Sequence, residues 1–330
     1  MRAVVLVGGF GTRLRPLTHS TPKQMLPVVH RPMIERVVEH LGRHGVTTAI
    51  LSLGYKPDAF TDAYPDGRCA GVDLHYAVEP EPLDTAGAIR FAADHAGIEE
   101  RFIVVNGDVL TDLDVTALVA FHERRGAEGT IALTKVDDPS AYGVVPTAPD
   151  GRVEAFIEKP PRDEAPTDLV NAGTYVLEPS VLERIPPGER VNVERVTFPA
   201  MVADGTLYAM DGTAYWIDAG TPATYLTANL DLVTGRWGEP EPGVHPDATV
   251  EGHVEEAVVE SGAVVAAGAV VARSVLLPGA VVEAGARVTG SVLGPGVVVR
   301  AGAIVEGSVL GDHVVVEGDQ HLVNVRLPEG

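Results

Sequence analysis

Glycines and basic residues follow the first apolar segment of the chain, and together they suit a bound phosphate group. Residues 2–7, RAVVLV, have the composition of a buried strand. The glycines that come directly after it are Gly8, Gly9 and Gly11. Glycine permits sharp turns that bring backbone N–H groups against an anion. Arg13 and Lys23 add positive charge to the same segment, so the composition indicates a site for a polyphosphate.

The segment 8–31 connects this strand to the first predicted helix, and connections of that length inside a domain are usually functional. It does not follow the common phosphate-binding patterns. After Gly11 the third glycine of G-x-G-x-x-G is missing, and there is no G-K-[ST]. On composition alone, the alternative interpretation is a tight turn that carries surface arginines.

Acidic residues and a lysine stand at the ends of later apolar segments. Asp108 follows a strand predicted at 102–106, and Asp218 lies in the string WIDAG. Glu158 and Lys159 end another predicted strand just before two prolines. Taken singly, each aspartate is typical of a turn at a strand end, and the Glu-Lys pair is typical of a surface ion pair.

A series of motifs places these residues in a common context. The strings are GGFGTRLRPLT with PKQMLPV (8–28), VNGDVL (105–110), FIEKP (156–160), NAGTYVL (171–177) and WIDAGTP (216–222). In this order they resemble the sugar-1-phosphate nucleotidylyltransferases, and most of all the mannose-1-phosphate guanylyltransferases. The resemblance extends along most of the chain, and ordered motifs are far more specific than any single one.

The resemblance implies a reaction between a nucleoside triphosphate and a sugar 1-phosphate. The sugar phosphate oxygen attacks the α-phosphorus and pyrophosphate leaves, so two anions must be neutralised and aligned. Arg13 and Lys23 are the expected catalytic residues: Arg13 would hold the departing phosphates, and Lys23 would stabilise charge at the α-phosphate. The expected nucleotide-binding residues are Leu6, Gly8, Gly9, Gly11, Thr12, Glu79 and Gly87.

The same resemblance implies Mg²⁺ as cofactor, held by Asp108 and Asp218. Mg²⁺ binds through one or two carboxylates together with phosphate oxygens and water. Glu158 would bond sugar hydroxyls, and Lys159 would pair with the sugar phosphate. The expected sugar-phosphate-binding residues are Gly143, Glu158, Lys159 and Asn171.

Glu79 favours GTP as the nucleotide. A carboxylate only accepts hydrogen bonds and so matches the N1–H and N2–H₂ donors of guanine, whereas thymidylyl and uridylyl relatives tend to have glutamine at this position. There are two departures from the guanylyl pattern: Gln24 replaces a proline, and Asp84 replaces the glycine of PLGTAGA. The alternative is therefore a glucose-1-phosphate thymidylyltransferase or uridylyltransferase. Mannose is the usual partner of GTP in this family, but a glucose, heptose or cyclitol phosphate would use the same phosphate contacts.

Two hypotheses from other classes remain open at this point. One is a catalytically silent subunit that binds nucleotide sugar and regulates a partner, although the charged residues Arg13, Lys23, Asp108 and Asp218 are all present. The other is a second activity, acyl transfer, in the C-terminal repeats. The repeats lack a long insertion that could build an acyl-CoA site, which favours a lid, a regulatory surface or an assembly face.

The elements that must position these residues fall into two parts. Residues 1–235 alternate predicted strands and helices, among them a helix at Pro32–His44 and strands at 48–53, 129–135 and 152–158. This order predicts an α/β, Rossmann-like nucleotidyltransferase domain with a mixed, mostly parallel sheet. A linker at 236–246 follows. Residues 247–330 repeat at a step of 17, with copies beginning at Ala257, Ser274, Ser291 and Ser308. This pattern resembles a short left-handed parallel β-helix of hexapeptide repeats.

Composition restricts the class of protein. The chain has 330 residues, 45% of them hydrophobic, and a formal net charge of −21, which argues against a nucleic-acid ligand. It has a single cysteine, Cys69, and no apolar run long enough to cross a membrane. The first residues have the pattern of a strand, without a basic region ahead of an apolar core, so we expect no signal peptide. We therefore expect a cytoplasmic protein that acts on small-molecule substrates. Because the end of a β-helix is an open edge, we also expect a homo-oligomer.

Overall fold

The computed structural model describes residues 1–328, and the chain divides into two compact units. The first unit comprises Met1–Gly9 and Ile34–Trp216, and the second comprises Phe10–Met33 and Ile217–Gly330. This division groups residues by their contacts and not by their order in the chain. It therefore does not test the predicted domain boundaries at 235 and 246, which stay a prediction.

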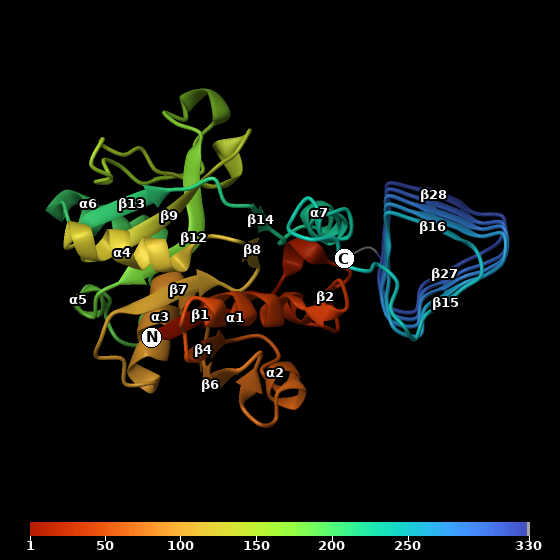
Figure 1. Cartoon of the computed structure of the whole chain (residues 1–330), viewed down its shortest axis with the longest axis horizontal. Coiled ribbons are helices and arrows are strands. Elements are labelled where there is room, and N and C mark those ends of the chain that lie inside the picture. Colours follow the sequence, from red (N-terminus) through yellow and green to blue (C-terminus); the bar gives the residue numbers. More distant parts are fainter. Residues whose placement is uncertain (329–330) are drawn as a thin grey trace. The chain divides into compact units, whose positions relative to one another are not determined.

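The first unit is built on a mixed sheet in the strand order β11-β10-β12-β7-β1-β4-β6-β5, with β9 paired to β12 and β13 (Figure 1). The central strands β7, β1, β4 and β6 are parallel, while β12 runs antiparallel to both β7 and β9. The bounds are β1 Arg2–Leu6, β4 Thr48–Leu53, β5 Arg68–Cys69, β6 Val72–Val78, β7 Phe102–Asn106, β8 Val109–Thr111, β9 Gly129–Lys135, β10 Gly143–Val144, β11 Ile157–Glu158, β12 Leu169–Leu177, β13 Leu207–Asp211 and β14 Trp216–Asp218.

Helices accompany this sheet, and apolar side chains from both form its core. Val4, Val104 and Tyr175 from the strands cluster with Ile89 and Phe198 from helices, all fully buried. The bounds are α1 Met33–Arg43, α2 Asp58–Ala63, α3 Asp84–His95, α4 Val115–Arg125, α5 Ser180–Glu183 and α6 Phe198–Asp204, with short turns η3 Pro139–Ala141, η4 Arg162–Glu164 and η5 Val193–Thr197. Because β1, β4, β6 and β7 are parallel, the loops after them leave one edge of the sheet.

Two predicted elements are corrected. The first helix begins at Met33, because Pro32 pairs with Pro27 in a short hairpin. The strand predicted at Arg152–Glu158 is reduced to β11, Ile157–Glu158. Its earlier part makes isolated bridges, and its backbone hydrogen bonds go to separate segments: Val153 N donates to Leu207 O and Glu154 N donates to Pro146 O, so no continuous ladder forms there.

The second unit contains the glycine-rich loop, helix α7 and the C-terminal repeats. The loop forms two short turns, η1 Thr12–Leu14 and η2 Lys23–Met25, then the hairpin β2 Pro27–Val28 and β3 Arg31–Pro32. Helix α7, Pro222–Val233, begins at Thr221 with a capping box. The loop and α7 are joined by a hydrogen bond from the Tyr225 hydroxyl to Pro27 O and by another from Val29 N to Asn229 Oδ1 (3.0 Å).

The C-terminal repeats form a prism of three parallel five-stranded sheets (Figure 1). The first sheet is β15 Thr249–Val250, β18 Val264–Val265, β21 Val281–Val282, β24 Val298–Val299 and β27 Val315–Val316; the second is β16 His253–Glu255, β19 Val270–Ala272, β22 Arg287–Thr289, β25 Ile304–Glu306 and β28 His321–Val323; the third is β17 Val258–Val259, β20 Val275–Leu276, β23 Val292–Leu293, β26 Val309–Leu310 and β29 Arg326–Leu327.

The predicted coil of 17 residues is confirmed, because each strand pairs with the one 17 positions later. The aligned serines form a ladder: Ser274 Oγ accepts from Ser291 N (3.1 Å), and Ser291 Oγ accepts from Ser308 N (3.0 Å). Buried Val, Leu and Ala side chains fill the interior of the prism. The α/β fold followed by a β-helix is therefore as predicted. None of the helices in the described part of the chain is long and apolar enough to cross a membrane.

Candidate active site

In the first unit, the glycines after β1 lie against Glu79. A Cβ placed on Gly8 would be 3.2 Å from Glu79 Oε1, and one on Gly54 would be 3.1 Å from Gly8 O. The Glu79 carboxylate is held at both oxygens: Ser52 Oγ donates to Oε1 (2.9 Å) and Leu83 N donates to Oε2 (3.1 Å). Leu6, at the end of β1, is half-buried, and Gly9, directly after Gly8, is exposed. The predicted nucleotide residues of this unit thus include a fixed acceptor beside a glycine turn.

Asp84, which departs from the glycine of the PLGTAGA pattern, lies at the start of α3 in a backbone conformation that favours glycine. Asp84 has a φ of +60°, in the left-handed region that aspartate tolerates better than most residues. Its Oδ1 accepts hydrogen bonds from Thr85 N (2.8 Å) and Asn192 Nδ2 (3.0 Å), which fixes the conformation. Gly87 follows on the same helix, and a Cβ there would be 2.5 Å from Glu189 O. The visible reason for Gly87 is this close backbone contact, and its role in nucleotide binding stays a prediction.

The residues predicted to bind the sugar phosphate lie on or beside β10, β11 and β12. Gly143 lies opposite Glu158 in the β10–β11 pair, and a Cβ on Gly143 would be 2.6 Å from the Phe156 ring. Lys159 Nζ is 3.3 Å from Glu158 Oε1, and the Lys159 side chain is 58% exposed. An ion pair this exposed adds little stability, so both groups are available to a ligand.

Asn171 is turned by an irregularity in β12, where the register with β9 shifts between Asn171 and Tyr175. Asn171 Nδ2 donates to the Tyr175 hydroxyl (2.9 Å), and its Oδ1 accepts from Gly173 N (2.9 Å). Burial raises the pKa of Tyr175 well above its usual range, and the charges of Glu194 and Glu158 raise it further. The Asn171 amide is therefore oriented by a hydroxyl that stays protonated.

Glu194 is a candidate site residue that the sequence analysis missed. It lies on η5, and its Oε2 accepts a hydrogen bond from Thr85 Oγ1 (2.9 Å). Burial raises the pKa of Glu194, and the charges of Glu158 and Asp84 add to this, against hydrogen bonds from its own backbone and from Thr85. No motif marks Glu194, because its partners Thr85 and Glu158 are distant in the sequence.

In the second unit, the glycine-rich loop folds back so that Gly11 adjoins Lys23. Gly11 has a φ of +64°, its carbonyl accepts from Thr18 Oγ1 (2.8 Å), and a Cβ on it would be 3.3 Å from Lys23 Cβ. Thr12 and Arg13 are exposed on the following turn. The glycine turn and the ammonium stem of Lys23 are thereby brought side by side, although they are far apart in sequence.

Arg13 lies beside Asp218 in this unit. Arg13 Nη2 is 3.6 Å from Asp218 Oδ2, and Gly220 N donates to Asp218 Oδ1 (2.8 Å). A Cβ on Gly220 would be 2.6 Å from Arg13 Nη2, so only glycine leaves room for the guanidinium. The side chain of Arg13 is 60% exposed, which leaves it accessible to a phosphate.

The two predicted metal ligands belong to different units, so their pairing stays a prediction. Asp108 is 8% exposed and follows Gly107, whose N–H donates to Leu6 O (2.9 Å). Within residues 1–328 there is no group of three or more His, Cys, Asp or Glu side chains that could hold a metal. Carboxylate donors fit a hard divalent cation that also takes phosphate and water oxygens.

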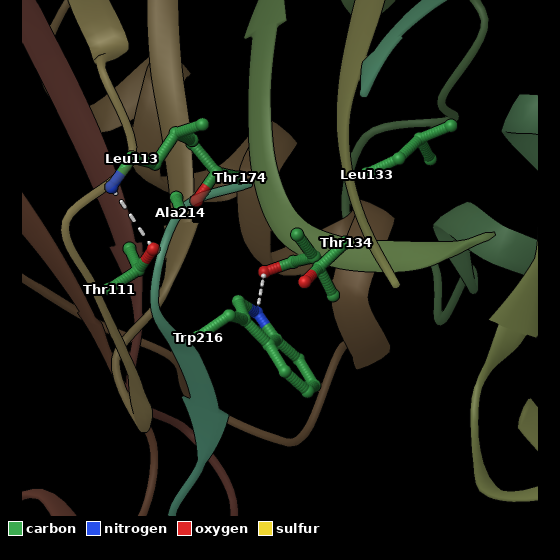
Figure 2. Close-up of a pocket in the computed structure, with 8 residues that line it drawn as sticks. Thr111, Leu113, Leu133, Thr134, Thr174, Ala214 and Trp216 are labelled. Atoms are coloured by element: carbon green, nitrogen blue, oxygen red, sulfur yellow. Dashed lines mark hydrogen bonds between the residues drawn. The ribbon is translucent and has the colours of Figure 1, made fainter. Parts of the chain in front are cut away.

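A small cavity lies near Trp216 and is too small for either substrate. Its volume is about 10 Å³, roughly that of one water molecule. Trp216 Nε1 donates to Ala172 O (2.9 Å) and Leu113 N donates to Thr111 Oγ1 (3.1 Å). Figure 2 shows Trp216, Leu113 and Thr111 among the residues that line this cavity. A larger surface pocket of about 620 Å³, lined by residues such as Lys135 and Asp211, includes none of the predicted site residues.

Comparison with known proteins identifies relatives of both parts. Residues 2–235 match the family model described as Nucleotidyl transferase, and residues 240–324 match the model described as GlmU-like, C-terminal hexapeptide. A mannose-1-phosphate guanylyltransferase of Mycobacterium tuberculosis (strain ATCC 25618 / H37Rv) is 41% identical over 271 residues, which are 82% of this chain and 72% of that protein. Mannose-1-phosphate guanyltransferases of Emericella nidulans and Schizosaccharomyces pombe are each 43% identical, over 71% and 73% of this chain and 65% and 67% of their own lengths. The chain thus spans about two thirds of the length of these curated relatives.

Solved structures share the fold of the first part. HddC from Yersinia pseudotuberculosis has a TM-score of 0.60 at 32% identity, covering 69% of this chain and 97% of that one. A putative glucose-1-phosphate thymidylyltransferase from Bacillus anthracis, in complex with a sucrose, has a TM-score of 0.63 at 26% identity, covering 69% and 94%.

Proposed function

Because the chain belongs to the nucleotidyl transferase family, we propose that it joins GTP to mannose 1-phosphate and forms GDP-mannose and pyrophosphate. Its relatives named for this reaction support the substrate pair. The structural observation that carries the choice of base is Glu79, an acceptor held at both oxygens beside Gly8. Two N–H donors on one edge of guanine suit such a carboxylate, whereas O4 of a thymine would be repelled by it.

The proposed reaction needs no side-chain nucleophile. The phosphate oxygen of mannose 1-phosphate forms a bond to the α-phosphorus of GTP, and the bond from that phosphorus to the β-phosphate oxygen breaks. Arg13 spreads its donors over the departing phosphates, and Lys23 neutralises charge at the α-phosphate. The backbone of the glycine turn, with Thr12, surrounds the nucleotide.

The sugar phosphate is proposed to bind along β10 to β12. Lys159 pairs with the phosphate, and Glu158 and Asn171 bond the sugar hydroxyls. Glycine at position 143 lets the Phe156 ring and the Glu158 carboxylate lie close against the backbone of β10. Glu194 adjoins this set, since its Oε2 accepts a hydrogen bond from Thr85 Oγ1 and burial, with the charges of Glu158 and Asp84, raises its pKa.

Nucleotidyl transferases generally use a divalent metal, and we propose Mg²⁺ here, held by Asp108 and Asp218. When bound, the ion supplies charge neutralisation and alignment of the two phosphate groups. The Asp218 carboxylate also forms an ion pair with Arg13, and this ion pair orients the Arg13 guanidinium. Assembly into a homo-oligomer remains a prediction.

The test is a grid of substrates with purified protein and Mg²⁺. GTP, ATP, UTP and dTTP are each combined with mannose, glucose and N-acetylglucosamine 1-phosphates, and pyrophosphate release is measured. We expect GTP with mannose 1-phosphate to give the highest kcat/KM. Turnover with dTTP or UTP but not with GTP would refute the base assignment. Nucleotide-sugar binding without turnover in any cell of the grid would instead favour a regulatory subunit.

A further inference from the structure

One of the three sheets of the β-helix is buried on its outward side as well as on its inward side. In the third sheet Val258, Val275 and Val292 face away from the interior cluster, yet all are 1% exposed or less. The corresponding positions of the first sheet, such as Val281, are only half-buried. Helix α7 contacts the third sheet at β17 and so covers part of this outward side.

The corner that follows the third sheet binds the glycine-rich loop at two coils. At the first of these coils, Glu260 accepts hydrogen bonds from His30 N (3.0 Å) and pairs with His30 Nδ1 (2.9 Å). At the later coil, Asp312 accepts a hydrogen bond from Ser20 Oγ. A Cβ on the neighbouring Gly311 would be 2.9 Å from Pro16 Cβ, which shows how closely the loop approaches there.

These two attachments lie on one aligned corner of the prism. Each coil has 17 residues, so position 260 aligns with 277, 294 and 311, and position 261 aligns with 278, 295 and 312. The intervening corner residues are Leu277, Pro278, Gly294 and Pro295. None of these four residues has a side chain that can form a hydrogen bond. The acidic corner residues Glu260 and Asp312 therefore stand at the two coils that the loop contacts. Three steps of about 4.8 Å separate these coils by roughly 14 Å.

The contact at Glu260 is buried and specific. Glu260 is 3% exposed, and His30 Nε2 bonds Pro242 O (2.9 Å), so both nitrogens of the imidazole are used. A buried carboxylate needs a partner of opposite charge, and removing that partner is far more costly than at the surface. At the other end, Arg326 Nη1 donates to Arg13 O (3.4 Å), which ties the last strand to the backbone of the catalytic arginine.

We propose that this corner of the β-helix positions the catalytic loop, with Glu260, Asp312 and Arg326 as positioning residues for Arg13 and Lys23. The segment from Ser20 to His30 carries Lys23 and is held at both ends, by Asp312 and by Glu260. Arg326 acts on the backbone of Arg13. The roles of Arg13 and Lys23 in this proposal rest on the proposed function. The contacts between the β-helix and the loop do not depend on which nucleotide the protein uses.

The experiment uses the full chain and follows the loop directly. Asp312→Ala, Ser20→Ala and the double variant are compared by hydrogen–deuterium exchange of peptides covering 10–33 and by steady-state kinetics. Arg300→Ala is the matched control, since it removes an ion pair with Glu283 inside the β-helix. We expect Asp312→Ala to speed exchange in the loop and to lower kcat about fivefold to tenfold, with KM for the sugar phosphate unchanged. The double variant should equal the single ones, because both remove the same contact.

Arg326 gives a second, independent readout. Arg326→Ala should loosen the 10–33 peptides, and Arg326→Lys should restore their protection because a lysine still donates to the carbonyl. Loop exchange and kcat no different from those of Arg300→Ala, or additive effects of Ser20→Ala and Asp312→Ala, would overturn the proposal. Because exchange is measured without substrate, it tests the coupling between the β-helix and the loop even if GTP proves to be the wrong nucleotide.

Discussion

Replacing Glu79 by glutamine should reduce the use of GTP selectively. Leu83 N donates to Glu79 Oε2, and an amide NH₂ cannot face this donor. The glutamine oxygen must therefore take the place of Oε2, and the NH₂ group takes the place of Oε1, where Ser52 Oγ can rotate to accept. Oε1 is also the oxygen nearest Gly8, so a donor would stand where guanine needs an acceptor.

The size of the effect follows from the hydrogen bonds that are lost. A hydrogen bond to a charged group contributes about 1.5–3 kcal/mol, and an unsatisfied donor facing another donor costs a similar amount. Since Glu79 is half-buried, we expect a loss of about 2–3 kcal/mol, or roughly 30- to 150-fold in kcat/KM for GTP. UTP should lose nothing or gain, because an amide can both donate to O4 and accept from N3–H.

The assay is pyrophosphate release with GTP, ITP and UTP, for the wild-type protein, Glu79→Gln and Glu99→Gln. The Glu99 variant removes the same charge at an exposed position of the first unit, so it controls for a general effect on the triphosphate. ITP lacks the guanine N2 amine and shows whether that group is recognised. A kcat/KM for GTP that stays within about twofold of wild type in Glu79→Gln would refute the reasoning.

Other substitutions test the remaining parts of the site. Lys159→Ala should raise KM for the sugar phosphate about tenfold or more and change KM for GTP little, because a charge-assisted hydrogen bond to the sugar phosphate is lost. A change in KM for GTP alone would contradict the assignment of Lys159 to the sugar phosphate. Glu194→Gln resembles the protonated acid that burial favours, so it should keep KM for the sugar close to wild type while Glu194→Ala raises it; equal losses in both would show that the charge is needed. Burial alone would lower the pKa of His30, but the hydrogen bond and charge of Glu260 and the Pro242 carbonyl outweigh it and raise the pKa. The resulting stability is full below pH 6.5 and is lost as the pH rises through the higher folded-state pKa, so thermal unfolding of the wild type should show this decline and that of Glu260→Gln should not.

Much of the fold could be predicted because its signals are local. The strands 48–53, 102–106 and 129–135 agree with the observed bounds, since each is a short apolar run that ends at a turn residue. The 17-residue step was equally readable, because successive coils repeat a corner glycine at Gly262, Gly279 and Gly296 and a serine at Ser274, Ser291 and Ser308.

What could not be predicted depends on contacts between distant segments. Glu194 reaches the site only through Thr85, and no single-chain pattern links those positions. The strand expected from Arg152 shortened because its backbone bonds go to residues outside any continuous ladder. Likewise, Glu260 and Asp312 look like ordinary acids within the repeats, and their function emerges only when the loop is folded against them.

The regular stacking of the coils has a consequence for the evolution of this chain. Neighbouring coils stabilise one another chiefly in pairs, so gain or loss of one whole repeat leaves a prism that still closes. An indel of this kind between Glu260 and Asp312 would nevertheless displace one anchor by about 4.8 Å while the stretch from Ser20 to His30 kept its length. Variation in repeat number among related chains should therefore be confined to the portions before the first of these acids and after the second.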